Sequence, residues 1–191
     1  MKQKVLVTGG TGYIGSHTII DLLENGYEVV CADNGINSDT SSLDAIRILT
    51  GVDVPYFHID LCDLKATETI FVQHPDITGI IHFAALKAVG ESVEKPILYF
   101  RNNLESLINI LDMSIKYEVK AFIFSSSCTV YGDVTTSPVD EKTPLQEAAS
   151  PYGRTKQIGE KIITDSIKNS QVKSILLRYF NPAGAHPSGL L

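Results

Sequence analysis

The chain has 191 residues, of which 43% are hydrophobic and 20% are charged, and its formal net charge at pH 7 is −6. This length and composition are typical of one globular domain with a sizeable core. The acidic balance argues against a nucleic-acid partner, and the apolar runs are too short to span a membrane.

Strand-like and helix-like segments alternate along the whole chain. Short β-branched or apolar runs predict six strands, at 5–8, 28–32, 55–59, 80–84, 121–125 and 174–179. Helical spacing of apolar residues predicts helices at about 14–24, 43–49, 65–73, 96–116 and 151–168, with polar loops at 34–42 and 132–150. This order predicts an α/β fold: one doubly wound (Rossmann) parallel sheet with helices on both faces, spanning residues 1–191.

The first strand runs into a glycine-rich turn that opens the first helix. The glycines fit two overlapping dinucleotide-binding patterns, Gly10-x-Gly12-x-x-Gly15 and Gly9-x-x-Gly12-x-x-Gly15. Glycine reaches positive φ easily, and a pyrophosphate can touch the backbone only where no Cβ intervenes. The helix N-terminus then offers N–H groups and partial positive charge to the anion. A purely structural turn is the alternative, but the strand–turn–helix context favours a nucleotide site.

Two carboxylates close neighbouring strands of the predicted sheet. Asp33 ends the second strand, eighteen residues after Gly15, and could accept hydrogen bonds from an adenosine ribose. Because it would repel a 2′-phosphate and no Arg is adjacent, it favours NAD over NADP. The simpler alternative is an Asp that begins a turn. Asp60 ends the third strand and could either contact the adenine or cap the next turn.

A tyrosine and a lysine lie four residues apart in the last predicted helix. Tyr152 and Lys156 would share one helix face, where the ammonium favours phenolate and lowers the pKa of the tyrosine toward the neutral range. A phenolate of that kind can act as a general base. The pair alone often occurs by chance. Ser127, at the end of the fifth strand, adds a hydroxyl that could orient a substrate or relay a proton, which makes the combination specific.

These motifs belong to longer stretches, at residues 7–18, 86–92, 124–132, 150–153, 177–182 and 184–189, that together resemble the extended short-chain dehydrogenase/reductase family. Within that family they are most similar to the nucleotide-sugar 4-epimerases. The resemblance implies that NAD stays bound while UDP-glucose and UDP-galactose are interconverted at C4 through a transient 4-keto sugar. Two alternatives remain: an NAD-binding module without turnover, or a 4-epimerase of another UDP-sugar, with an N-acetylhexosamine or a pentose.

The resemblance also implies roles for individual residues. Tyr152 would be the catalytic base, Lys156 its electrostatic partner and a ligand of the cofactor ribose, and Ser127 a substrate contact. Asn181 would meet the diphosphate of the UDP-sugar. The residues expected to line the cofactor are Gly9, Gly12, Tyr13, Ile14, Gly15, Asp33, Asn34, Asn37, Ser38, Asp60, Leu61, Phe83, Ala84, Lys87, Asn102, Tyr152, Lys156 and Phe180.

The chain departs from its relatives in two ways. Related sugar-nucleotide 4,6-dehydratases carry an acidic pair where Cys128 and Thr129 stand here, so dehydration lacks its acid. The family also continues into a smaller substrate domain, whereas this chain ends at Leu191, so we expect the cofactor-binding part without that domain. In the family the helices corresponding to 96–116 and 152–168 form a dimer bundle, which implies a homodimer.

The remaining polar and apolar residues suggest no further site. The three cysteines are an odd number without paired spacing, which indicates a reducing, cytoplasmic compartment. The five histidines lack metal-ligand spacing, so we expect no metal. The first strand follows the N-terminus directly, which leaves no room for a signal peptide. One helical stripe is expected in the core: Leu104, Leu107, Ile108, Leu111 and Ile115.

Overall fold

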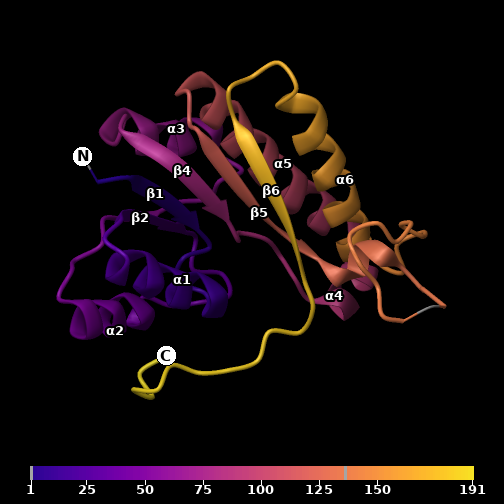
Figure 1. Cartoon of the computed structure of the whole chain (residues 1–191), viewed down its shortest axis with the longest axis horizontal. Helices are drawn as coiled ribbons and strands as arrows, with labels where there is room; N and C mark the ends of the chain where they lie inside the picture. The colour runs from indigo at the N-terminus through magenta and orange to yellow at the C-terminus, as the bar shows by residue number, and fades with distance from the viewer. Residues whose placement is uncertain (1, 136) are drawn as a thin grey trace.

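The computed structural model describes residues 2–135 and 137–191; Met1, and Thr136 within the expected loop 132–150, lie outside the described residues. Six strands form one parallel sheet, which confirms the predicted fold class (Figure 1). The strands are β1 (Lys4–Thr8), β2 (Glu28–Asp33), β3 (Tyr56–His58), β4 (Ile77–His82), β5 (Ala121–Ser127) and β6 (Lys173–Tyr179). The helices are α1 (Tyr13–Glu24), α2 (Ser41–Thr50), α3 (Leu64–Gln73), α4 (Val89–Glu94), α5 (Pro96–Lys116) and α6 (Pro151–Ser166), with a 3₁₀ turn η1 (Cys128–Tyr131).

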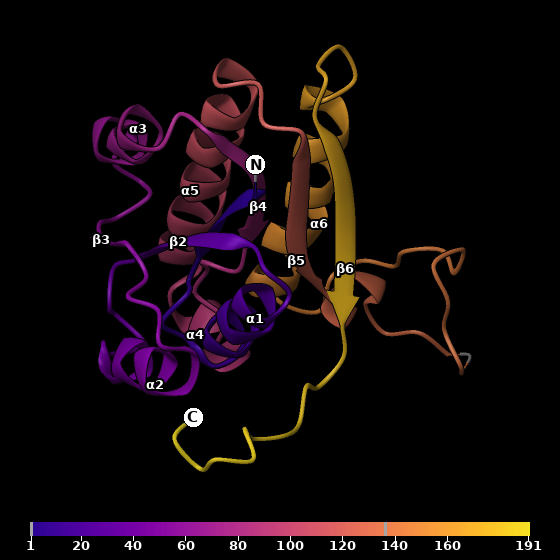
Figure 2. The ribbon, with the colours of Figure 1, turned by 60° about the vertical axis from the view of Figure 1, so that its left-hand side comes forward.

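Alternating residues of the strands pack into two separate core layers, one on each face of the sheet. In β1, Leu6 packs into the layer beneath α3, α5 and α6, whereas Val5 and Val7 pack into the layer beneath α1 and α2. This alternation follows from the period of two along a strand. Figure 2 shows the helices on the two faces of the sheet. Helices therefore cover both faces of the sheet, as is typical of a parallel sheet.

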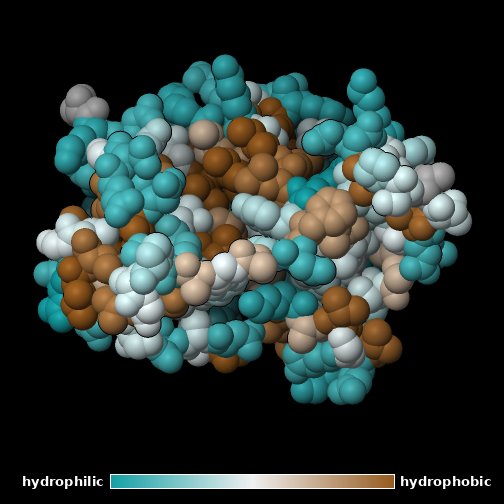
Figure 3. All heavy atoms as spheres, turned by 60° about the horizontal axis from the view of Figure 1, so that its bottom comes forward, coloured by the Kyte–Doolittle hydropathy of each residue, from teal (hydrophilic) through white to brown (hydrophobic). Residues whose placement is uncertain are grey.

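The cover on the α1 side does not extend across the whole sheet. Over β5 and β6 that face is open: Ile175 and Leu177 of β6 are 56% and 36% exposed. Apolar side chains gather on this part of the molecule, beside the more polar surface around it (Figure 3).

The strand order is β3-β2-β1-β4-β5-β6, so the chain leaves β1 toward one side and later returns on the other. This reversal lies between β1 and β4, which pair in parallel from Lys4 to Thr8. In open α/β sheets, the loops at the carboxyl ends of strands separate at such a point and leave a crevice. The fold therefore places a crevice beside the glycine turn.

Two local expectations were wrong. β4 begins at Ile77 and ends at His82, instead of covering 80–84, because Ile77 pairs with Lys4 of β1 and the Thr78 hydroxyl donates to the Lys4 carbonyl. The polar Thr78 and the small Gly79 hide this strand in the sequence pattern. The short helix α4 was not expected, since its six residues are too few to show helical periodicity.

The buried face of α5 also differs from the expected stripe. Leu107 and Leu111 are buried as expected, but Ile108 and Ile115 are 49% and 39% exposed, while Ile110 is buried. The helix turns a partly polar face inward, because small or amide side chains at several positions find partners there; buried residues on this face include Asn103, Ser106, Asn109, Met113 and Ser114.

Within the part of the chain that the structure describes, none of the helices combines the length and apolarity needed to cross a bilayer.

Candidate active site

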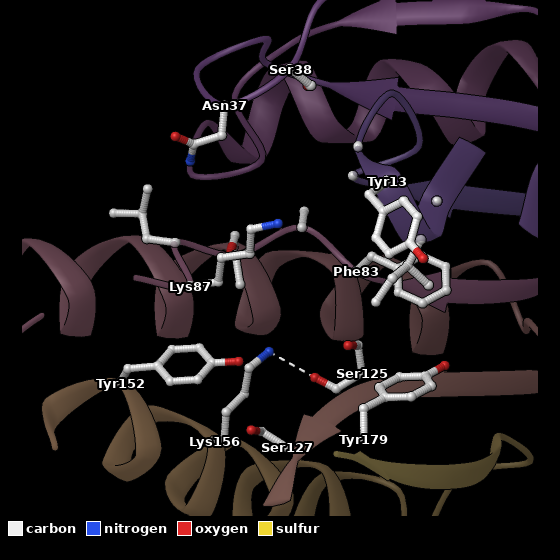
Figure 4. Close-up of a pocket in the computed structure, with 18 of the residues that line it drawn as sticks. Tyr13, Asn37, Ser38, Phe83, Lys87, Ser125, Ser127, Tyr152, Lys156 and Tyr179 are labelled. Atoms are coloured by element: carbon white, nitrogen blue, oxygen red, sulfur yellow. Dashed lines mark hydrogen bonds between the residues drawn. The ribbon is translucent and has the colours of Figure 1, made fainter. Parts of the chain in front are cut away.

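A cleft of about 600 Å³ runs along the carboxyl ends of the strands. Its walls come from the β1–α1 turn, the ends of β2, β5 and β6, the segment after β4, and the first turns of α6. Figure 4 shows Tyr13 and Phe83 near one end of the cleft and Tyr152 and Lys156 at the other. Binding clefts of small ligands are typically about 300–1,000 Å³, so a dinucleotide-sized ligand is in range.

The glycine turn is packed so tightly that side chains could not replace its glycines. Gly9 has a φ of 69°, and a Cβ there would lie 2.7 Å from the Ala84 nitrogen. A Cβ on Gly15 would collide with the Gly9 carbonyl. By contrast, a Cβ on Gly12 would meet only the Gly9 oxygen, at 3.3 Å, and would otherwise extend into open space. A ligand can therefore approach the backbone at Gly12.

The N-terminus of α1 opens on this turn. The N-cap is Gly12, which offers no side chain to bond the first N–H groups of the helix. Tyr13 and Ile14 line the cleft at this point. Because a helix N-terminus binds anions and its usual side-chain cap is missing here, the residues present fit a pyrophosphate.

Asp33 lies buried at the end of β2 and joins two loops. Its carboxylate accepts hydrogen bonds from the backbone N–H of Thr11 at 3.2 Å and of Gly35 at 2.9 Å. The Ser38 hydroxyl also donates to it, at 3.2 Å. The carboxylate thereby holds the loop after β2 against the glycine turn while it lines the cleft.

All residues that the sequence assigned to a cofactor or a substrate line this one cleft. The structure adds cleft residues that the sequence analysis did not assign. Ser125 and Tyr179 stand near the carboxyl ends of β5 and β6, where the strand-end rule places residues that face a ligand, although the sequence analysis assigned them no individual role. Val89 and Ser106 come from helices whose orientation depends on packing alone, so no sequence signal marks them. Further additions are Ile59, Ser126, Cys128, Thr129 and Pro182.

The first turns of α6 are built to present Tyr152 and Lys156 to the cleft. Ser150 is the N-cap, and its hydroxyl accepts from the Gly153 N–H at 3.1 Å, while Pro151 supplies the preset φ of the first position. Farther along, Glu160 accepts from Arg178 of β6 at 3.0 and 2.8 Å. This ion pair, between the buried Glu160 and the half-buried Arg178, holds α6 against the strand that leads to Phe180.

Lys156 is a cation in a nearly closed environment. Its side chain is only 4% exposed, and its ammonium donates to the Ser125 carbonyl at 2.7 Å, as the dashed line in Figure 4 marks. The Nζ atom also lies 4.7 Å from the centre of the Phe124 ring and 5.8 Å from that of Tyr152. Burial lowers the pKa of Lys156 to about 8, because the charged form loses its hydration.

Tyr152 differs from the expectation that Lys156 would lower its pKa. Burial raises the pKa of Tyr152 above its ordinary value; the Ser127 hydroxyl lowers it and the Cys128 thiol raises it further. The physical reason is that the ammonium of Lys156 is directed at the Ser125 carbonyl and the Phe124 ring. The geometry places both side chains together, but in this state desolvation outweighs the cation.

His82 is the buried histidine nearest to this group. Its Nδ1 is 2.8 Å from the Thr8 hydroxyl, and its ring stacks on Phe124 at 6.1 Å between centroids. Burial, together with the charge of Lys156, lowers its pKa to about 3, so it stays neutral. Among the described residues, no cluster of three or more His, Cys, Asp or Glu is placed to hold a metal ion.

The strand order, the glycine turn and the cleft at the switch point define a nucleotide-binding α/β protein of the Rossmann type. More narrowly, the chain belongs to the NAD dependent epimerase/dehydratase family, whose model matches residues 5–190. This confirms the family resemblance.

The chain is similar to proteins described as UDP-glucose 4-epimerases. It is 52% identical to that of Schizosaccharomyces pombe over 98% of this chain and 54% of the relative, and 48% identical to that of Bacillus subtilis over 97% and 54%. The UDP-glucose 4-epimerase of Bifidobacterium longum, solved with NAD⁺ and UDP, superposes with a TM-score of 0.96 at 46% identity, over 99% of this chain and 56% of that one. The chain therefore spans about half the length of the relatives it matches.

Proposed function

We propose that this chain binds NAD and is the cofactor-binding part of a UDP-hexose 4-epimerase, which interconverts UDP-glucose and UDP-galactose. The observation that carries the proposal is that one cleft contains the glycine turn, Asp33 and the Tyr152, Lys156 and Ser127 side chains. The family and the similar epimerases support it. In this proposal residues 1–191 form one NAD-binding domain.

Different residues of the cleft would bind different parts of the cofactor. The backbone at Gly12 and the first turn of α1 would hold the pyrophosphate. Asp33 would accept from the adenosine ribose, and Lys156 would donate to the ribose near Tyr152. The further residues that would line the cofactor are Gly9, Tyr13, Ile14, Gly15, Asn34, Asn37, Ser38, Asp60, Leu61, Phe83, Ala84, Lys87, Asn102 and Phe180.

The chemistry needs a group that removes a proton from the sugar 4-hydroxyl. Bound NAD supplies the reversible acceptance of a hydride from C4. Tyr152, as phenolate, would take the hydroxyl proton and later return it. Ser127 would lie beside the reacting oxygen of the sugar, and the positive charge of Lys156 would favour the phenolate. Asn181 would contact the diphosphate of the substrate.

A homodimer through α5 and α6 is part of the proposal. The outer face of α5 carries the exposed apolar residues Ile97, Ile108 and Ile115. Exposed apolar residues in a row are typical of an interface between subunits. Sedimentation velocity of the purified chain would test this: we expect a dimer, and Ile108→Glu is expected to give a monomer.

Two alternatives have specific support. The first is an NAD-binding module without turnover; the match covers only about half of the length of the similar epimerases, which supports it. A different UDP-sugar is supported by the similar UDP-Glc/GlcNAc 4-epimerase of Campylobacter jejuni, with a TM-score of 0.87 at 33% identity, over 93% of this chain and 53% of that one. The experiment below separates all three.

The test uses the purified 191-residue chain. We expect NAD to be identified by mass spectrometry after denaturation and UDP-galactose to be converted to UDP-glucose. Tyr152→Phe should keep the bound NAD and lose conversion, whereas Tyr117→Phe, outside the cleft, should keep both. Retained NAD without any conversion would favour the module, and conversion only of another UDP-sugar would reassign the substrate. A sample that retains no pyridine nucleotide would contradict the proposal.

A further inference from the structure

The 3₁₀ turn η1 contains a threonine that bonds the active-site serine twice. The backbone N–H of Thr129 donates to the Ser127 Oγ at 3.2 Å, and the Thr129 hydroxyl donates to the same atom at 3.0 Å. A serine hydroxyl has two acceptor lone pairs and one O–H donor. Thr129 therefore occupies both acceptor positions of Ser127, and only the donor remains for another partner.

The remaining donor of Ser127 has few places to go. The side chain is 8% exposed and lines the cleft, so bulk water satisfies it poorly. Figure 4 shows its hydroxyl in the same part of the cleft as the Tyr152 phenol. A buried polar hydrogen needs an acceptor, and the Ser127 hydroxyl acts on the Tyr152 phenol as a hydrogen-bond donor that lowers the pKa of Tyr152. A donor at that oxygen stabilises phenolate more than phenol.

We propose that Thr129 is a positioning residue for the base: by filling both lone pairs of Ser127, it holds this serine as a hydrogen-bond donor to the Tyr152 oxygen. The inference rests on the proposed function, in which Tyr152 is the base.

The packing around Thr129 fixes the direction of its hydroxyl. A Cβ on Gly153 would lie 3.1 Å from the Thr129 carbonyl oxygen and 3.3 Å from its Cβ, so α6 contacts the threonine directly beside Tyr152. The β-branched side chain also has few rotamers. The donor to Ser127 is thus held by the same helix that carries the base.

Other groups face Tyr152 from each element around it. Lys156 approaches from α6, but its ammonium is bonded to the Ser125 carbonyl. Cys128 of η1 raises the pKa of Tyr152, and burial does the same. Tyr99 of α5 donates its hydroxyl to Glu91, at 2.9 Å, and Lys87 enters the cleft from the segment after β4 (Figure 4). Since the Ser127 hydroxyl lowers the pKa of Tyr152 against the larger effect of burial, its orientation affects how much phenolate forms.

The test is an NMR titration of tyrosine labelled with ¹³C at Cζ, in which Tyr152→Phe assigns the signal of Tyr152. Thr129→Val removes the hydroxyl but keeps the backbone N–H and the branched shape. In this variant we expect the phenolate-to-phenol ratio of Tyr152 at pH 10 to be about tenfold lower than in the unchanged chain, as for the loss of one hydrogen bond. Thr129→Ser should restore the ratio, and Thr164→Val, a control on α6, should leave it unchanged.

The outcomes separate this inference from the proposed function. An unchanged ratio in Thr129→Val, or an equal fall in Thr129→Ser, would overturn the inference, even if the chain converts UDP-galactose. A ratio that falls in Thr129→Val and stays at the level of the unchanged chain in Thr129→Ser supports the inference, even if the chain retains no NAD and converts no sugar. The titration needs neither cofactor nor turnover, whereas bound NAD and conversion are measured separately.

Discussion

Lys156 should destabilise the fold in a way that depends on pH. Its pKa is about 8 in the folded chain, against 10.5 for an ordinary lysine. Because the folded pKa is the lower one, the unfolded chain binds more protons between these values, and stability rises with pH in that window. The penalty is about 3 kcal/mol at pH 7 and about 1.4 kcal/mol at pH 9.5.

The substitution Lys156→Met removes this penalty and keeps most of the side-chain volume. It also leaves the Ser125 carbonyl without its donor, which costs about 1–3 kcal/mol at either pH. The pH-independent loss cancels when two pH values are compared. The wild-type chain should therefore gain about 2 kcal/mol relative to the variant between pH 7 and pH 9.5.

Urea unfolding followed by far-UV circular dichroism at both pH values measures this difference. The matched control is Gln157→Met on the same helix, since Gln157 is also buried and donates to backbone carbonyls but does not titrate. We expect the control to differ from wild type by the same free energy at both pH values. If Lys156→Met behaves like this control, the lysine does not carry a buried charge and the reasoning is refuted.

Three more substitutions test the cleft and its support. Gly15→Ala should lower the melting temperature and abolish NAD retention, because its Cβ would collide with the Gly9 carbonyl; a variant that purifies with full NAD would contradict the tight turn. Asp33→Ala should weaken NAD binding at least tenfold in calorimetry, since the carboxylate holds two loops, and unchanged affinity would remove it from the site. Glu160→Gln should cost about 2 kcal/mol in urea unfolding, because the half-buried guanidinium of Arg178 loses its charged partner; a loss below about 0.5 kcal/mol would show that the pair is weak.

The sequence by itself determined the fold class and many of the residues that line the cleft. The glycine turn, Asp33 at the end of a strand and the pair Tyr152 and Lys156 each follow from short-range chemistry. Each feature restricts the local backbone: the turn has no Cβ atoms, the carboxylate follows a strand, and the tyrosine and lysine are four positions apart on a helix. Since the carboxyl ends of parallel strands meet at one edge of a sheet, the cleft then assembles from these local features.

Only the tertiary structure decided the electrostatics and the helix faces. Spacing brings Lys156 beside Tyr152, but the ammonium of Lys156 donates to the Ser125 carbonyl. Burial is therefore the stronger influence, and the pKa of Tyr152 is raised, although the cation alone would lower it. Likewise, the pattern of α5 could not show that Ile108 faces outward while Ile110 packs inward. Desolvation and packing depend on what the other elements place nearby, and a local pattern of residues does not contain that information.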